Sequence, residues 1–83
     1  MYVSYDPKAR ATYVEIEDDA RVTRTVHISD LVMVEVDVDT QPVGVEFVVG
    51  PNEITQGMVD SVTDRFPSLK PLNDMHSWLL VGA

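Results

Sequence analysis

Four carboxylates could carry chemistry in this chain: Glu15, Glu35, Asp37 and Glu46. Each lies in an extended, β-branched segment at alternating positions, so we expect all four on one sheet face. Converging carboxylate oxygens can bind a hard divalent cation, whereas a spread of carboxylates suits a basic protein surface. Parallel side chains on a flat sheet converge poorly, which favours the basic partner. A solvated face that keeps sheets from stacking on one another is the alternative.

Other reactive groups show no catalytic spacing. There is no cysteine, and His27 and His76 lie far apart without a second ligand at short spacing, which disfavours zinc. No serine lies in a nucleophile elbow, and the glycines are too scattered for a phosphate loop. We therefore predict no catalytic, cofactor-binding or metal-binding residue, no cofactor, and a protein that is not an enzyme.

The C-terminal end offers a second kind of surface. Trp78 and Leu79 open a short apolar run that either packs on this domain or forms an interface with another chain. Together with the carboxylates they make up the candidate partner-binding residues: Glu15, Glu35, Asp37, Glu46, Trp78 and Leu79.

The elements that must position these residues begin with a sheet. Alternation of apolar and polar residues, interrupted by turn signals, predicts five strands at 1–5, 11–17, 21–28, 32–38 and 43–49. We expect consecutive strands to pair as an antiparallel meander. The predicted contacts are Val3 with Val14, Ile16 with Val22, Val26 with Val34, Val34 with Phe47, and Glu35 with Glu46.

Composition changes after Pro51. Ile54, Met58, Val62 and Phe66 recur every four residues, which predicts a helix over 53–66 with Asn52 as its N-cap. Its apolar stripe should pack on the apolar sheet face, followed by a short helical or irregular tail. The expected fold is α+β: one domain, 1–83, with a five-stranded antiparallel β-meander over 1–50 and a C-terminal helix and tail over 51–83.

Length and charge narrow the function classes. The chain has 83 residues and a formal net charge of −8. A negative surface repels nucleic acid and anionic membranes, so we expect neither as a direct partner. The chain shows no secretory signal and no apolar run long enough to span a membrane, which favours a cytoplasmic protein. A domain this small also favours a homodimer that buries a sheet edge or the tail.

Three short motifs resemble a known family. Residues 5–16 read YDPKARATYVEI, residues 36–39 read VDVD, and residues 42–47 read PVGVEF. Over about residues 1–50 the chain resembles the small bacterial and phage family called domain of unknown function 2283. The family usually has a glycine in the acidic turn, where this chain has Asp39-Thr40-Gln41-Pro42. The resemblance implies a small β-rich accessory or regulatory domain, and some members of the family lie near toxin-like genes. It assigns no site residue in this chain.

Three functional hypotheses follow. The first is a non-enzymatic interaction or regulatory module that binds another protein, such as a basic, toxin-like or host protein, through the acidic sheet face or the Trp78 tail. The second is an acidic mimic of nucleic acid that inhibits a protein handling DNA or RNA, through the same four carboxylates together with Glu17. The third is an enzyme that uses a divalent metal or a small ligand. Salt-sensitive binding separates docking through the carboxylates from docking through the Trp78 tail, and a thermal shift with a divalent cation tests the third hypothesis.

Overall fold

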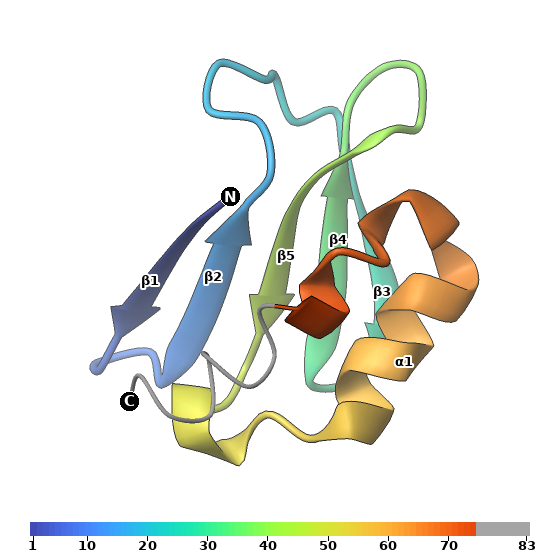
Figure 1. Cartoon of the computed structure of the whole chain (residues 1–83). Coiled ribbons are helices and arrows are strands. Elements are labelled where there is room, and N and C mark those ends of the chain that lie inside the picture. Colours follow the sequence, from blue (N-terminus) through green and yellow to red (C-terminus); the bar gives the residue numbers. More distant parts are fainter. Residues whose placement is uncertain (75–83) are drawn as a thin grey trace.

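The computed structural model describes residues 1–74 and is an antiparallel sheet with a helix on one face (Figure 1). The strands are β1 (Tyr2–Asp6), β2 (Ala11–Glu15), β3 (Arg24–Ser29), β4 (Val32–Val36) and β5 (Pro42–Phe47). The helical elements are the 3-10 turn η1 (Pro51–Glu53), the helix α1 (Gln56–Arg65) and the 3-10 turn η2 (Pro67–Leu69). The predicted α+β class, with five antiparallel strands and a C-terminal helix, is confirmed.

The order of the strands departs from the predicted meander at one pairing, because β2 lies next to β5 and not next to β3. The sheet runs β1-β2-β5-β4-β3, so β2 pairs with β5, and the predicted contact of Ile16 with Val22 is wrong. The backbone N–H of Ile16 instead donates to the Val43 carbonyl at 2.9 Å. This order places the most buried strand, β5, in the centre and the largely exposed strand β3 at the edge, where exposed side chains carry no desolvation penalty.

The register is partly as predicted. Val3 faces Val14 and Val26 faces Val34, as expected, but Val34 faces Val45 rather than Phe47. The β4–β5 pairing is therefore shifted by two residues, with an irregularity between Glu35 and Val36. A shift of two keeps each side chain on its face, because the side-chain period of a strand is also two.

One turn explains this shift. The Asp37 carboxylate accepts hydrogen bonds from the backbone N–H groups of Asp39 and Gln41, at 2.9 and 3.0 Å. The turn thus starts two residues before the predicted one, at Asp37 rather than Asp39. Val38 lies in the turn with 80% of its surface exposed, rather than in a strand.

The core lies between one sheet face and the C-terminal elements. The helix α1 crosses this face of the sheet, in front of β3 and β4 in the view of Figure 1. Thr12 is the one buried polar side chain on β2, and its hydroxyl donates to the Val49 carbonyl at 2.9 Å. The apolar side chains that form this buried core are Val14, Val32, Val34, Val36, Val45, Phe47, Ile54, Val59, Val62, Leu69 and Leu72.

The helix begins later than predicted. Its N-cap is Thr55, whose hydroxyl accepts from the Met58 N–H at 3.2 Å, and not Asn52. Glu53 belongs to η1 instead, where its carboxylate accepts from the Gly50 N–H at 3.0 Å and pairs with Arg10 at 3.2 Å. The Gly50 N–H and then Arg10 lower the pKa of Glu53, since both favour the charged carboxylate.

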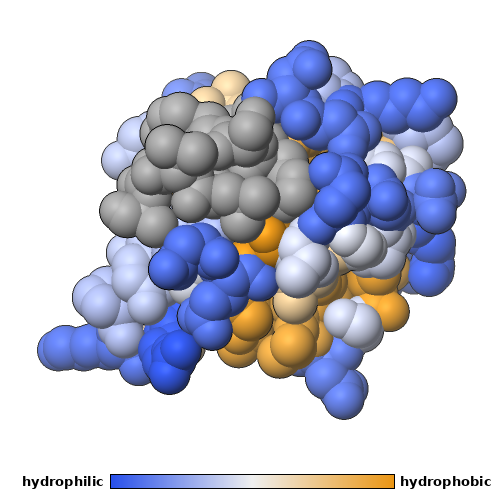
Figure 2. Space-filling model, turned by 60° about the horizontal axis from the view of Figure 1, so that its bottom comes forward, coloured by the Kyte–Doolittle hydropathy of each residue, from blue (hydrophilic) through white to orange (hydrophobic). Residues whose placement is uncertain are grey.

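The described residues include no membrane-spanning helix, and they expose some apolar surface. Within residues 1–74, no helix combines the length and the hydropathy that a bilayer crossing requires. Viewed from below, most of the visible surface is hydrophilic, but hydrophobic surface emerges among the charged groups (Figure 2). Residues 1–74 thus leave apolar surface in view, and Leu31, between β3 and β4, is 42% exposed.

Candidate functional site

The sheet face turned away from α1, here called the open face, carries the candidate carboxylates. Two rows of side chains cross it from β1 to β3. The register places Tyr2, Glu15, Gly44, Glu35 and Thr25 in the first row. It places Ser4, Tyr13, Glu46, Met33 and His27 in the second row. The open face therefore brings Glu15, Glu35 and Glu46 together on three adjacent strands.

The predicted opposition of Glu35 and Glu46 is wrong. Glu35 faces Gly44, and Glu46 faces Met33 on one side and Tyr13 on the other. The two-residue register shift that the Asp37 turn imposes is the cause. No two of the three glutamates are direct cross-strand partners, so the pairwise repulsion of facing carboxylates is avoided.

Tyr13 organises the centre of the open face. Its hydroxyl donates to Glu35 Oε1 at 2.6 Å, although β5 lies between their strands β2 and β4. The ring reaches across because the residue beneath it is Gly44. A Cβ at position 44 would overlap the Tyr13 phenol, with the ring carbon Cζ only 2.6 Å away. A glycine inside a strand is typical of such a close approach.

The electrostatics around the phenol are negative. Burial, the hydrogen bond to Glu35, and the charges of Glu35, Glu15 and Glu46 all raise the pKa of Tyr13 above its ordinary value. Tyr13 therefore remains a neutral hydrogen-bond donor at physiological pH. The ion pair of Arg10 with Glu53 is the one salt bridge within residues 1–74, so these three glutamates have no cationic partner in that range.

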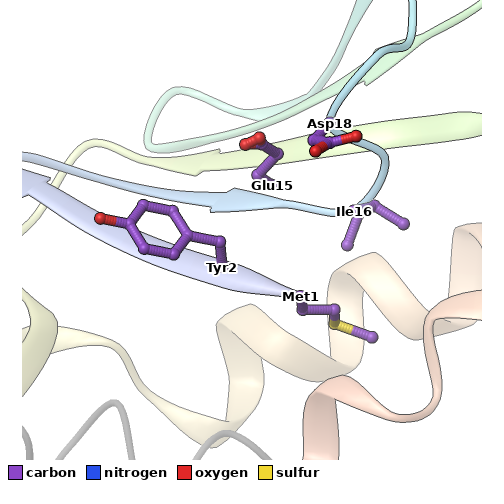
Figure 3. Close-up of a pocket in the computed structure, with 5 residues that line it drawn as sticks. All are labelled: Met1, Tyr2, Glu15, Ile16 and Asp18. Carbon is purple, nitrogen blue, oxygen red and sulfur yellow. The ribbon is translucent and has the colours of Figure 1, made fainter.

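A shallow hollow extends this acidic surface toward the edge of the sheet. It has a volume of about 480 Å³ and is lined by Met1, Tyr2, Glu15, Ile16 and Asp18. Figure 3 shows the carboxylates of Glu15 and Asp18 near each other on one side, with the Tyr2 ring and the Met1 thioether on the other. Such a margin of carboxylates beside an aromatic ring suits a cationic side chain.

The remaining predicted residues lie apart from this group. Asp37 follows the end of β4, and its carboxylate accepts hydrogen bonds from two backbone N–H groups of the turn. A structural role in the turn therefore explains this aspartate. Trp78 and Leu79 lie outside the described residues. Among residues 1–74, no three His, Asp or Glu side chains are arranged to hold a metal ion.

Tyr13, at the centre of the open face, is not indicated as a site residue by the sequence pattern, and neither are Tyr2 and Asp18 of the hollow. The available signal was Gly44, a glycine inside an otherwise β-branched strand. Such a glycine indicates that something approaches the backbone closely, but it does not say which side chain does so. The partner became identifiable only with the β2–β5 pairing, which joins segments distant in the sequence.

Comparison with known proteins gives no match: none among protein-family models, none among curated proteins and none among solved structures. The resemblance of residues 1–50 to the family described above thus stays a prediction.

Proposed function

We propose that this protein is a small, non-enzymatic binding module whose open face docks on a basic surface of another protein. One observation carries the proposal: Glu15, Glu35 and Glu46 lie on adjacent strands of one sheet without a cationic partner in residues 1–74. A partner that supplies Lys or Arg side chains would provide the missing counter-charges.

The geometry gives the face some specificity. The Tyr13 hydrogen bond holds the Glu35 side chain in one conformation before any partner binds. Docking therefore loses less side-chain conformational entropy at this position. The hollow beside Glu15 offers Asp18 and the Tyr2 ring to a cation at the margin of the face. A partner should therefore present basic side chains over a flat area, with one reaching toward β1.

The test is capture of partners from cell extract on immobilised protein, eluted with a salt gradient, for wild type and two matched variants. Glu15→Gln/Glu46→Gln removes two charges from the open face and leaves the Tyr13–Glu35 bond intact. Asp19→Asn/Asp64→Asn removes two exposed charges elsewhere. We expect the first variant to bind about fivefold to tenfold more weakly, and the second to bind as wild type does.

The outcomes separate the hypotheses. Equal loss in both variants would indicate an effect of net charge alone and would contradict a specific face. A captured protein that handles DNA or RNA and is displaced by polynucleotide would favour acidic mimicry. A thermal shift with Mg²⁺, Mn²⁺ or Ca²⁺ that disappears in Glu35→Gln would instead favour the metal-dependent alternative.

A further inference from the structure

The two edges of the sheet differ in how they are protected. The edge strand β3 has a register irregularity between His27 and Ser29 and carries Arg24, two features that discourage edge-to-edge pairing. The edge strand β1 pairs all five of its residues with β2 in uninterrupted register, and it has neither a proline nor a basic residue. No other strand of residues 1–74 pairs with its outer side.

The side chains of β1 are also those of an interface rather than of a solvated edge. Tyr2 is 67% exposed and Tyr5 is 42% exposed, and they lie on opposite faces of the strand. Tyrosine is enriched in protein interfaces because it buries a large area at a small cost in side-chain entropy. Asp6 is the only charged residue of the strand, in a chain whose net charge is −8.

The strand is complementary to a second copy of itself. Antiparallel pairing centred on Ser4 places Val3 opposite Tyr5 of the second copy, and Tyr2 opposite its Asp6. Val3 and Tyr5 share the core face, while Tyr2, Ser4 and Asp6 share the open face, so each pair matches side for side. The one carboxylate meets an uncharged phenol rather than its own like charge.

We propose that two copies of this chain pair through β1, antiparallel and centred on Ser4, to form one continuous sheet. The two-fold axis is then normal to the sheet, so both α1 helices lie on the same side. The two open faces join on the other side into one surface with twice the carboxylates. This dimer does not depend on the basic partner proposed above, because the pairing involves β1 alone.

The test uses charge at the two-fold axis, where residue 4 meets residue 4. Ser4→Lys and Ser4→Glu each place like charges opposite one another, and an equimolar mixture of the two places opposite charges there. Mass is measured by sedimentation velocity over a concentration series, with circular dichroism to verify folding. Thr25→Lys is the control, since Thr25 is exposed on the open face at the other edge.

We expect wild type and Thr25→Lys to dimerise. Each Ser4 variant alone should have a dimer dissociation constant at least about fivefold higher, and the mixture should restore dimerisation. A monomeric wild type would overturn the proposal, as would Ser4 variants that dimerise normally. If the mixture of Ser4→Lys and Ser4→Glu dimerises as weakly as each variant alone, the register centred on Ser4 is wrong. If the variants fail to fold, amide exchange of wild type decides, because only a β1 dimer gives concentration-dependent protection confined to β1.

Discussion

Tyr13 and Gly44 act as one unit on the open face. The phenol passes over the glycine and reaches Glu35 two strands away, so a single hydrogen bond ties β2 to β4 across β5. The arrangement fixes one carboxylate of the proposed docking face and fills the space that a side chain at position 44 would occupy. Its parts can be tested separately.

Replacing Gly44 should displace the ring. In Gly44→Ala the new Cβ overlaps the phenol, so the ring moves and its hydrogen bond to Glu35 is lost. We expect the free energy of unfolding in urea to fall by about 1–3 kcal/mol. In a Tyr13→Ala background the same substitution should have almost no effect. An equal loss in both backgrounds would show that the overlap is not the cause.

Removing the hydroxyl should change stability in a pH-dependent way. Tyr13→Phe should lower the free energy of unfolding by about 1 kcal/mol at neutral pH, because the hydrogen bond to Glu35 is lost. The pKa of Tyr13 is raised in the folded state, so its contribution is complete below the unfolded value of about 10 and declines as the pH rises above it. Urea titrations between pH 8 and pH 12 measure the difference. A constant gap between the two proteins across this range would contradict the assignment.

The turns between strands determine the register, and the turn between β4 and β5 holds a β-branched residue in a strained conformation. Thr40 adopts φ 63° in the turn that Asp37 caps, and its N–H donates to the Asp37 carbonyl at 3.0 Å. The left-handed region is unfavourable for a β-branched side chain and is readily adopted by glycine and asparagine. The turn therefore contains local backbone strain at Thr40.

Relieving this strain should stabilise the protein. We expect Thr40→Gly or Thr40→Asn to raise the free energy of unfolding by about 0.5–1 kcal/mol, measured by urea titration. As a control, Thr25→Gly in the extended strand β3 should lower it by a similar amount, because glycine is unfavourable inside a strand. A loss of stability in both Thr40 variants would show that the threonine side chain itself supports the turn.

The elements show which features local patterns can predict. Alternation predicted both faces of the sheet, because the side-chain period identifies a face and is insensitive to a shift of two residues. For the same reason it could not predict the β4–β5 register, which depends on the Asp37 carboxylate. The helical stripe was recognisable from Ile54 to Phe66, but the start of α1 depended on the competing hydrogen bond of Glu53 to Gly50.

The candidate site was predictable to a similar extent. The period placed Glu15, Glu35 and Glu46 on one face without knowledge of the strand order. Their spacing, and the part played by Tyr13, depend on β5 lying between β2 and β4. The pairing of β2 with β5 brings together residues that are distant in the sequence, so no short-range pattern predicts it. Trp78 and Leu79 remain a prediction outside the described residues.

Charge is the property that concerns the whole molecule. With a net charge of −8, repulsion opposes the compact state, and salt should relieve it by screening. We expect about 0.5 M NaCl to raise the melting temperature of wild type by about 3–5 °C. Glu15→Gln/Glu46→Gln should show a smaller rise, since part of the repulsion is already gone. Thermal unfolding followed by circular dichroism measures both, and an unchanged salt response in the variant would place the repulsion elsewhere.

The β2–β5 join also dictates an order of assembly. The strands β3, β4 and β5 each find a partner next to them in the chain, whereas the β1–β2 hairpin finds its neighbour only at residues 42–47. An isolated two-stranded hairpin is only marginally stable in water, and docking it closes a long loop. During synthesis the ribosome must therefore release β5 before the β1–β2 hairpin can dock, so the first two strands of the chain wait for the fifth.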